Sequence, residues 1–258
     1  MSNRVLEFKN VSFQYQTEKI VTPESVLNEI NFHIHEGEFV SIIGASGSGK
    51  STIFRLITGL EQPSQGEIHL NGKNTNDRLG QIGYMPQQDL LMPWRTIMEN
   101  AMLPLEIKGV PKDEAQLQIS ELLVEFGLRG VEHDFPSDLS GGMRQRVSFL
   151  RTVLSGSNIL LLDEPFSALD AITRLTMQEW LLEQWVKWKK TILFITHDVD
   201  EALFLSDRIF ILQPKPVSTI EDIKVPLSRP RGIRDLAQSE VIVLKEVLID
   251  RLREKVTI

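Results

Sequence analysis

Apolar and polar residues alternate in the N-terminal part of the chain. Residues 5–15 and 30–35 show this pattern, which predicts strands with one buried face. Residues 65–72 predict another strand, which ends at an Asn-Gly turn. His33 and His35 share the polar face of the second strand, and we interpret them as an exposed face rather than as a shared metal site. The first third of the chain is thus predicted to be rich in β-structure.

Between residues 89 and about 154 the spacing of apolar residues becomes that of helices. One apolar stripe in this stretch has the three- and four-residue spacing of a helix face. It consists of Ala115, Ile119, Leu122, Leu123 and Phe126. Gly127 follows directly and predicts the end of that helix, and residues 141–153 predict another helix, which is rich in arginine. We interpret the stripe as a core-facing surface, not as a cofactor-binding face.

Buried strands are predicted again in the last part of the chain. Continuous apolar runs at residues 158–163, 191–196 and 208–212 are typical of parallel strands that are covered on both faces. A long helix is predicted between the first two runs, over residues 171–190. Prolines then interrupt regular structure before a last amphipathic helix, over residues 239–255, which is expected to pack back on the core.

A glycine-rich sequence lies between a short apolar strand, residues 38–43, and a helix over residues 52–58. It matches the phosphate-binding pattern G-x-x-x-x-G-K-[ST]. Its residues are Gly44, Ala45, Ser46, Gly47, Ser48, Gly49, Lys50, Ser51 and Thr52. The glycines allow backbone N–H groups to face a polyphosphate, Lys50 can reach the β- and γ-phosphates, and Ser51 can hold Mg²⁺. An accidental match is expected in on the order of one chain in a hundred of this length, and the flanking strand and helix make it rarer, so we predict nucleotide binding.

Two adjacent acids, Asp163 and Glu164, end the apolar run that begins at residue 158. Asp163 is placed to orient the Mg²⁺ shell, and Glu164 to polarise a water for attack on the γ-phosphate. An acid pair that only faces solvent at the end of a strand is common. The phosphate-binding sequence upstream favours the catalytic interpretation.

The net charge, the cysteine count and the lengths of the apolar runs disfavour several classes of function. The formal net charge of −7 disfavours binding to a nucleic-acid backbone. The absence of cysteine excludes a disulfide framework, a thiol nucleophile and a Cys-ligated zinc site. No apolar run reaches the roughly 18 residues of a membrane span, and the first strand begins too early for a signal peptide. We therefore expect a cytoplasmic protein that reaches a membrane only through a partner.

The sequence Leu-Ser-Gly-Gly-Met, from Leu139 to Met143, is followed by Arg-Gln-Arg. Placed between a phosphate-binding loop and an acid-ended strand, it resembles the signature motif of the ATP-binding subunits of ABC transporters. This resemblance implies ATP and Mg²⁺ as cofactors. It also implies that Ser140, Gly141 and Gly142 face the γ-phosphate of ATP held by the other subunit, so that two copies form a homodimer on binding ATP. A serine hydroxyl and N–H groups at a helix N-terminus suit an anion.

Three further residues are similar to landmarks of the family, and the resemblance implies their roles. Asp170, which ends Ser-Ala-Leu-Asp, resembles the loop that links the two half-sites of the dimer. His197 resembles the switch histidine that hydrogen-bonds the γ-phosphate. Tyr15 is similar to the aromatic residue that stacks on adenine, with Phe13 as the alternative.

A glutamine pair follows Met-Pro in the middle of the chain. Gln87 is similar to the hinge glutamine that reaches the metal and reports to the membrane partner, and Gln88 is the alternative. The distance to the sequence Leu91-Met-Pro-Trp94, which resembles Leu-Leu-Pro-Trp of the family, favours Gln87. We expect a cytoplasmic helix of the membrane subunit to dock beside residues 87–94.

From residue 4 to about 235 the chain is similar to the ATPase subunits of nitrate-, sulfonate- and taurine-type importers. This implies an α/β fold in one domain: a P-loop core with an antiparallel β subdomain and an inserted helical subdomain. We expect the core at residues 1–88 and 154–213, the helical subdomain at 89–153 and a C-terminal segment at 214–258. The implied partners are transmembrane permease subunits and a solute-binding protein, and the implied location is the cytoplasmic face of the cell membrane.

Three other functions fit part of the pattern. Non-transport ATPases of the same superfamily tend to carry a long coiled-coil insertion or a second cassette, and these 258 residues contain neither. A P-loop kinase for a small molecule would have no use for the signature motif or for His197. A catalytically silent regulatory subunit is disfavoured by the intact Lys50, Asp163 and Glu164. We therefore predict an ATPase that energises the import of a small solute, which separate subunits select.

Overall fold

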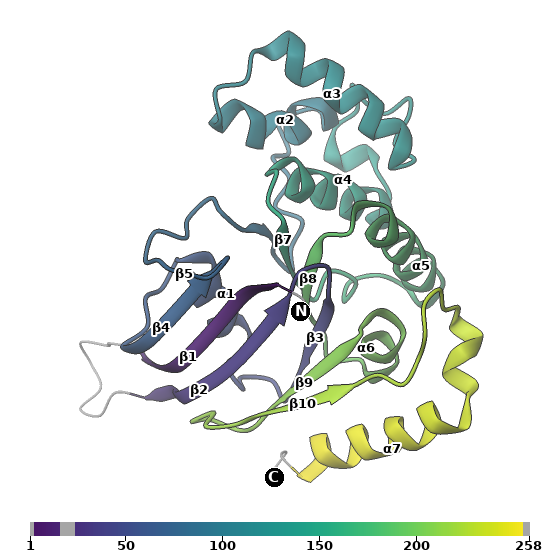
Figure 1. Ribbon diagram of the computed structural model, residues 1–258. Coiled ribbons are helices and arrows are strands. Elements are labelled where there is room, and N and C mark those ends of the chain that lie inside the picture. The colour runs from purple at the N-terminus through teal and green to yellow at the C-terminus, as the bar shows by residue number, and fades with distance from the viewer. Residues whose placement is uncertain (1–2, 16–23, 255–258) are drawn as a thin grey trace. The chain divides into compact units, whose positions relative to one another are not determined.

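The computed structural model describes residues 3–15 and 24–254 of the chain. The chain forms two compact units, each with strands and helices (Figure 1). The first unit comprises Met1–Leu79 and Gln184–Ile258, and the second comprises Gly80–Glu183. No helix in the described ranges is long and apolar enough to cross a membrane.

An antiparallel sheet with the strand order β2-β1-β4-β5 lies in the first unit. Its strands are β1 (Arg4–Gln14), β2 (Ser25–His35), β4 (Gln65–Leu70) and β5 (Lys73–Asn74). Alternating apolar residues such as Phe8 and Ile34 are buried, which confirms the predicted half-buried strands. Asn71 and Gly72, with φ of 50° and 76°, form the predicted tight turn between β4 and β5.

A second, mainly parallel set of strands lies in the same unit. It consists of β3 (Phe39–Ile43), β8 (Thr191–Ile195), β9 (Arg208–Leu212) and β10 (Ile220–Lys224). β3 pairs in parallel with both β8 and β9, and β10 pairs antiparallel with β9. All five residues of β3 and all five of β8 are buried, and all are apolar except Ser41 of β3 and Thr191 of β8. This agrees with parallel strands that are covered on both faces.

Strand β10 corrects one prediction. We expected no regular structure between residue 213 and the last helix, but Ile220–Lys224 forms a strand. Only Ile220 and Ile223 are apolar, and none of the five residues is fully buried, so the sequence carries no clear strand pattern. The strand forms because its whole length pairs with β9, and pairing of this kind is not visible in the local sequence.

The C-terminal helix packs on the core of the first unit. The helical segments described in this unit are α1 (Lys50–Thr58), α6 (Val199–Leu205), the 3₁₀ helix η2 (Ile233–Ala237) and α7 (Ser239–Glu254). Val241 and Leu248 of α7 belong to one buried cluster with Leu203 of α6 and Ile209 of β9. The predicted packing of the C-terminal helix is therefore confirmed, and its predicted last residue, Lys255, lies outside the described residues.

A buried arginine closes the C-terminal end of α1. Arg78 is fully buried, and its guanidinium donates to the carbonyl of Leu56 at 3.0 Å and to Gln62 Oε1 at 2.9 Å, and also contacts the carbonyl of Thr75. Burial lowers the pKa of Arg78. The carbonyls at a helix C-terminus carry partial negative charge, which compensates for the buried cation. The segment after the phosphate-binding helix is thus anchored by a residue that the hydrophobic pattern did not single out.

The second unit combines a strand pair with most of the helices. β6 (Gly83–Met85) and β7 (Ile159–Asp163) run parallel. The helical segments described here are α2 (Ile97–Ile107), α3 (Lys112–Glu125), the 3₁₀ helix η1 (Pro136–Asp138), α4 (Gly141–Leu154) and the first part of α5 (Ala171–Trp188). Ala115, Ile119 and Leu123 of α3 are buried, which confirms the core-facing stripe. The predicted limits of the helical subdomain, residues 89–153, fall inside this unit and stay a prediction.

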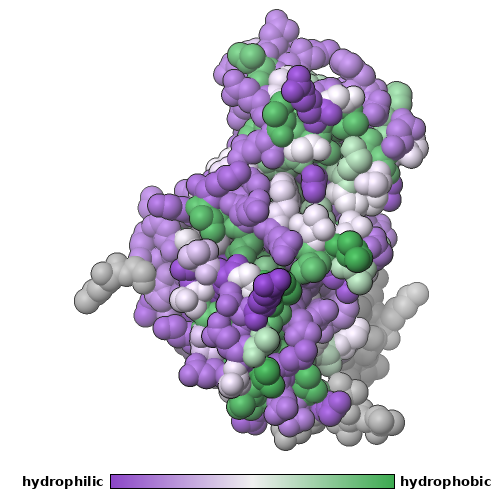
Figure 2. All heavy atoms as spheres, turned by 90° about the vertical axis from the view of Figure 1, so that its right-hand side faces the viewer, coloured by the Kyte–Doolittle hydropathy of each residue, from purple (hydrophilic) through white to green (hydrophobic). Residues whose placement is uncertain are grey.

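Aromatic side chains fill the interior of the second unit. The rings of Phe126, Phe149 and Trp180 lie with their centroids 5.1 to 6.1 Å apart. The guanidinium of Arg146 lies 5.5 Å from the Trp180 ring, a cation–π contact. On the outside, the face drawn in Figure 2 is mostly hydrophilic, with hydrophobic residues in separate patches. This is the surface expected of a chain in which 24% of the residues are charged.

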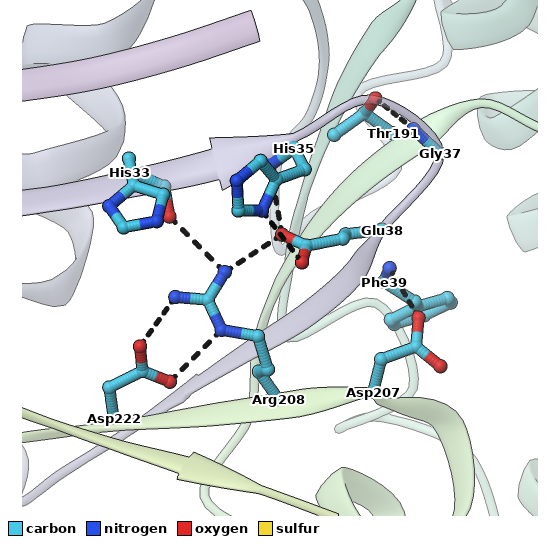
Figure 3. Close-up of polar contacts among 9 residues, drawn as sticks. All are labelled: His33, His35, Gly37, Glu38, Phe39, Thr191, Asp207, Arg208 and Asp222. Carbon is cyan, nitrogen blue, oxygen red and sulfur yellow. Dashed lines mark hydrogen bonds and ion pairs between the residues drawn. The ribbon is translucent and has the colours of Figure 1, made fainter. Parts of the chain in front are cut away.

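A polar cluster joins β2, β9 and β10 in the first unit (Figure 3). Arg208 donates to both carboxylate oxygens of Asp222, at 3.0 and 2.5 Å, and to Glu38 Oε2 at 2.8 Å. The ring Nδ1 of His35 lies 3.1 Å from Glu38 Oε1, and the rings of His33 and His35 are 4.8 Å apart. Because Arg208 places positive charge beside both histidines, the arrangement disfavours a metal cation.

This cluster predicts that stability falls in mild acid. Burial, followed by the positive charges of Arg4 and Arg208, lowers the pKa of His33 below the ordinary value of 6.5. The unfolded chain therefore binds a proton at His33 more readily than the folded chain. The contribution of His33 to the free energy of unfolding is fully present above pH 6.5 and is lost as the pH falls from there through the lowered pKa. The pKa of Glu38 is lowered from 4.5, so this carboxylate stays ionised in that window.

Urea unfolding at about pH 7.5 and about pH 5.5 measures this effect. We expect the wild-type midpoint to fall between the two conditions by more than the midpoint of His33→Gln. His133→Gln, which changes an exposed histidine of the other unit, should keep the wild-type difference. An equal fall in all three proteins would contradict the role assigned to His33.

Candidate active site

The phosphate-binding loop connects β3 to α1 in the first unit. Its conformation requires glycine at Gly47 and Gly49, whose φ angles of 76° and 102° lie in the left-handed region. At Gly44 the constraint is space, because a Cβ there would lie 2.9 Å from Ser48 Oγ. The loop leads into α1 at Lys50. The first N–H groups of a helix have no partner within it, so this end of α1 suits an anion.

Lys50, Ser48 and Ser51 add polar side chains to the backbone N–H groups of the loop. Lys50 is only 8% exposed, and its Nζ donates to the carbonyls of Gly44 at 2.9 Å and Ala45 at 3.0 Å. Ser48 Oγ is buried and has no hydrogen-bond partner among the residues that the structure describes. A buried hydroxyl without a partner is unfavourable, and a phosphate oxygen would satisfy it. Ser51, in contrast, is exposed, so its hydroxyl is open to a ligand from solvent.

Tyr15 lies beside the start of α1. Its hydroxyl is 3.2 Å from Thr52 Oγ1, and its ring contacts the Phe13 ring edge-on with the centroids 4.8 Å apart. Phe13 is 5% exposed and belongs to the core. The structure therefore brings Tyr15, and not Phe13, to the end of the phosphate-binding loop, which supports Tyr15 as the aromatic residue for adenine.

His197 follows β8 and is exposed. In the register of the parallel pair, Ile195 at the end of β8 lies opposite Ile42 at the end of β3. The phosphate-binding loop follows β3 directly. Because the carboxyl ends of parallel strands meet at one edge of a sheet, the loop and His197 leave the same edge.

The two predicted catalytic acids follow β7 in the second unit. Asp163 is 8% exposed and accepts a hydrogen bond at 3.3 Å from the hydroxyl of Tyr84. Glu164 has a φ of 45°, a conformation that is uncommon for a residue other than glycine and recurs at functional sites. Gln87 Nε2 donates to Glu164 Oε2 at 3.1 Å. This contact supports Gln87, over its neighbour Gln88, as the glutamine of the site.

Helix α4 holds the segment that follows the two glutamines. Arg144 Nε lies 3.3 Å from Asp89 Oδ2, and Ser148 Oγ donates to the carbonyl of Asp89 at 3.3 Å. Arg151 donates to the carbonyls of Asp89 and Leu90, at 2.5 and 2.9 Å. The sequence predicts an arginine-rich helix here but assigns its arginines no role. The spacing of residues 144, 148 and 151 along one helix face was the available signal.

The signature sequence begins α4. Ser140 is the N-cap, and its Oγ accepts from the backbone N–H of Met143 at 3.3 Å while the residue stays exposed. Gly142 is buried, and a Cβ there would lie 3.0 Å from the Thr173 side chain of α5. Glycine at this position therefore allows α4 and α5 to approach closely, and Ser140 and Gly141 remain at the accessible end of the helix.

Asp170 caps the start of α5. Its Oδ1 accepts from the backbone N–H groups of Ile172 and Thr173, each at 3.1 Å. Hydrogen bonds from Thr173, the largest influence, lower the pKa of Asp170. The loop before α5 is thus shaped by its own side chain, and Asp170 is exposed at the surface of the unit.

The residues predicted to meet ATP and Mg²⁺ offer suitable donor groups. The loop supplies backbone N–H groups, the Lys50 ammonium and the Ser48 hydroxyl, all of which suit phosphate oxygens. Ser51, Gln87 and Asp163 supply a hydroxyl, an amide and a carboxylate oxygen, the hard ligands that Mg²⁺ prefers. The side chains therefore fit the nucleotide and the metal chemically.

Comparison with known proteins agrees with these features. The sequence model described as ABC transporter matches residues 27–167. The formylaminopyrimidine import ATP-binding protein ThiZ of Halalkalibacterium halodurans is 48% identical over 226 residues, which cover 88% of this chain and 86% of that protein. An aliphatic sulfonates import ATP-binding protein, SsuB 1 of Rhodococcus jostii, is 42% identical over 228 residues, 88% of this chain and 87% of that protein.

A solved structure supports the same family. A dimeric ATP-binding cassette in a post-hydrolysis state, bound to ADP and phosphate, has a TM-score of 0.72 and 32% sequence identity. The match covers 88% of this chain and 99% of that chain. The expected fold class and the resemblance to sulfonate-type import subunits are thereby confirmed. The chain belongs to the ABC transporter family and is one of its ATP-hydrolysing, ATP-binding subunits.

Proposed function

We propose that this ATPase energises the import of a small organic solute of the class that includes formylaminopyrimidine and aliphatic sulfonates. The observation that carries the proposal is the 48% and 42% identity, over 88% of the chain, to import subunits named for those two solutes. Taurine is itself an aliphatic sulfonate and belongs to this class, and nitrate, an inorganic anion, is the alternative solute that we include in the proposal. The chain works at the cytoplasmic face of the cell membrane, with transmembrane permease subunits and a solute-binding protein as its partners.

The first unit binds ATP in this proposal. The loop from Gly44 to Thr52 surrounds the triphosphate, with Lys50 on the β- and γ-phosphates and Ser48 Oγ on a phosphate oxygen. Tyr15 stacks on the adenine. The left-handed glycines and the position of Tyr15 beside Thr52 support these roles. The buried Ser48 hydroxyl, which has no hydrogen-bond partner within residues 3–15 and 24–254, supports them as well.

Hydrolysis requires water to attack the γ-phosphorus while the bond to the ADP oxygen breaks. Glu164 accepts the proton of the attacking water, and Gln87 orients its carboxylate through their 3.1 Å hydrogen bond. His197 donates a hydrogen bond to the γ-phosphate. Ser51 of the first unit and Gln87 and Asp163 of the second would be the ligands of Mg²⁺, which when bound would supply positive charge to the phosphate oxygens.

Two copies of the chain share their ATP molecules in this proposal. Ser140, Gly141 and Gly142 of one copy bind the γ-phosphate of the ATP held by the other, and Asp170 lies in the loop between the half-sites. The exposed Ser140 and the half-buried Gly141 at the N-terminal end of α4 support this role, because the first N–H groups of a helix have no partner within it and suit an anion. The dimeric state of the similar ATP-binding cassette supports it as well.

A loop on the second unit is suited to docking the permease. Leu90 is 59% exposed and Trp94 is 73% exposed, whereas Leu91 between them is buried. The buried Asn100 side chain anchors this loop: it accepts from the backbone N–H of Met92 at 2.7 Å and donates to three carbonyls of residues 92–96 at 3.0 to 3.1 Å. Large apolar side chains held on an ordered surface loop favour a protein partner.

Photo-crosslinking tests this function, since the native chain has no cysteine. We expect a photoreactive maleimide on Gln88→Cys or Pro93→Cys, both exposed positions, to form an adduct with a membrane subunit in membranes that contain the transporter. The same reagent on Gln118→Cys, exposed on α3, is the control and should form none. If neither test position forms an adduct with a membrane protein, the result would favour a non-transport ATPase of the same superfamily.

A further inference from the structure

Helix α6 begins directly after His197, and its first turn is fixed by side chains. Asp198 Oδ1 accepts from the backbone N–H groups of Asp200 at 2.9 Å and Glu201 at 3.1 Å. Thr196, on the other side of His197, accepts from the N–H of Asp198 at 3.0 Å and contacts the buried carboxylate of Glu201. The backbone of His197 is therefore held between β8 and α6, so a shift of α6 would move it.

The other end of α6 is held by the C-terminal segment. Arg231 Nη1 donates to the carbonyls of Leu203 at 3.1 Å and Ser206 at 2.8 Å. Arg229 Nη2 donates to the carbonyl of Leu205 at 2.6 Å. These three carbonyls come from the last turn of the helix, where backbone oxygens lack partners within the helix and carry partial negative charge.

Both arginines are fixed in place by contacts away from α6. Asp207 Oδ1 accepts from Arg229 Nε at 2.8 Å, and the Arg229 guanidinium lies 4.1 Å from the centre of the Trp185 ring. Arg231 also donates to the carbonyl of Leu227 at 3.1 Å. Each guanidinium therefore has hydrogen bonds both to α6 and to groups outside it. Side chains held in this way can couple the position of α6 to that of the C-terminal segment, which a mobile surface side chain could not do.

The half-buried Arg229 and the buried Arg231 need the carbonyls of α6 as partners for their positive charges. Arg231 is 8% exposed, and burial, followed by the charge of Arg229, lowers its pKa to about 10. Two guanidinium groups share the single carboxylate of Asp207. The charge of Asp235 also favours the charged form of Arg231, and the carbonyls of Leu227 and of α6 supply partial negative charge. Burial of a charge is unfavourable unless such partners are present. The two arginines therefore depend on the position of α6, and α6 on theirs.

A second contact from the C-terminal segment reaches the beginning of α6. Lys245 Nζ of α7 lies 2.7 Å from the Asp200 carboxylate. Asp200 is in the first turn of α6, and its backbone N–H donates to Asp198. The C-terminal segment thus contacts both ends of the short helix that follows His197.

We propose that Arg229 and Arg231 are positioning residues for His197, which they hold in place through α6. The proposal rests on the proposed function in one respect, namely that His197 contacts the γ-phosphate. The C-terminal segment, residues 214–258, is then part of the ATPase mechanism rather than only a cover for the core. Loss of either guanidinium lets α6 shift, which moves His197 without touching the phosphate-binding loop.

Histidine NMR of the full chain tests the positioning directly. The chain has only five histidines, so the His197 ring signal can be assigned by its loss in His197→Asn. We expect Arg231→Met to shift the His197 signal and to leave those of His33 and His69, in the same unit, unmoved. Arg251→Met removes an exposed arginine of α7 and is the matched control, which should leave all signals unmoved.

Kinetics supply the second measurement. Arg231→Met should lower the kcat of ATP hydrolysis about tenfold, with KM for ATP within about twofold of wild type. Arg231→Lys keeps the positive charge but loses the planar guanidinium, whose N–H groups bond several carbonyls at once. Its kcat should therefore lie between those of Arg231→Met and the wild type. Arg229→Met should act in the same direction and decides the question if Arg231→Met does not fold.

The results distinguish failure of the positioning role of Arg229 and Arg231 from failure of the catalytic role of His197. A His197 signal that stays in place in folded Arg231→Met or Arg229→Met overturns the positioning role. Movement of the His33 and His69 signals together with His197 overturns it as well, because a general loss of structure would then be the cause. If His197→Ala keeps the wild-type kcat, the catalytic role of His197 fails, whereas the NMR result still decides the coupling.

Discussion

Glu164→Gln is expected to bind Mg-ATP almost normally and to hydrolyse it about 10²- to 10⁴-fold more slowly. An amide cannot accept the proton of the attacking water, so the step that Glu164 carries is lost. The loop from Gly44 to Thr52 is unchanged, which is why binding should persist. Single-turnover phosphate release and a nucleotide-binding titration measure the two quantities separately.

The same variant should be an ATP-dependent dimer. ATP that is not hydrolysed keeps its γ-phosphate, which Lys50 of one copy and Ser140 of the other would bind together. Removal of the Glu164 charge also relieves repulsion with the phosphates, which favours the closed state. Light scattering should therefore show a dimer with ATP and a monomer or looser pair with ADP. Ser140→Arg, added to Glu164→Gln, should abolish the dimer because the larger side chain fills the signature half-site.

Glu179→Gln is the matched control for this experiment. It makes the same change on an exposed face of α5 and should keep the wild-type hydrolysis rate. Hydrolysis at the wild-type rate by Glu164→Gln would show that Glu164 is not the base. If the variant binds ATP but stays monomeric at high protein concentration, the shared-site arrangement is wrong for the isolated subunit.

Lys50→Ala should lower the rate of ATP hydrolysis by about 10²- to 10³-fold. The ammonium is lost from the phosphates, and the loop also loses the two hydrogen bonds from Nζ to the carbonyls of Gly44 and Ala45. Stabilisation by ATP should disappear as well. In the wild type, ATP at about a hundred times its Kd should raise the free energy of unfolding by about 2.7 kcal/mol.

Thermal unfolding with and without ATP, together with an ATPase assay, measures both effects. Lys73→Ala is the control, because Lys73 is an exposed lysine of β5 in the same unit. Unfolding without nucleotide should stay cooperative in both variants, with a lower midpoint for Lys50→Ala because of the two lost hydrogen bonds. A cooperative transition shows that the fold is retained. A Lys50→Ala protein that turns over ATP at the wild-type rate would exclude the role of the phosphate-binding loop.

Elements with a strong local signal could be predicted from the sequence. The mainly apolar strands β3, β7 and β8 and the glycine-rich loop before α1 lie where the pattern placed them. The same is true of Gly127 after α3, which has a φ of 65°. In each case the requirement is local: a strand buried on both faces favours apolar residues along its whole length, and a left-handed turn favours glycine.

Edge elements and the ends of helices were harder to predict. Strand β10 has two apolar residues in five and forms through pairing with β9. α5 ends at Trp188, two residues before the predicted end. Both depend on neighbours distant in the sequence, because backbone hydrogen bonds to another strand, or packing at a helix end, decide whether a weak pattern becomes regular structure.

The choice between candidate site residues also required the structure. Spacing alone left Gln88 as an alternative to Gln87, and the hydrogen bond to Glu164 favours Gln87. Likewise, Phe13 lies in the core, whereas the Tyr15 hydroxyl meets Thr52 at the start of α1. Such neighbouring residues differ in burial and in contacts, which the local pattern does not show, and only the folded chain sets which of them reaches the site.

The sequence by itself determined the chemistry of this protein: a phosphate-binding loop, an acid pair after a buried strand, and a signature sequence between them. Those features are carried by adjacent residues, because the backbone turns and helix ends that bind phosphate are local. Only the tertiary structure decided that Arg78 closes the phosphate-binding helix and that Arg229 and Arg231 hold α6 behind His197. These arginines bind carbonyls between 22 and 28 residues away in the chain, so their partners become neighbours only when the core has packed.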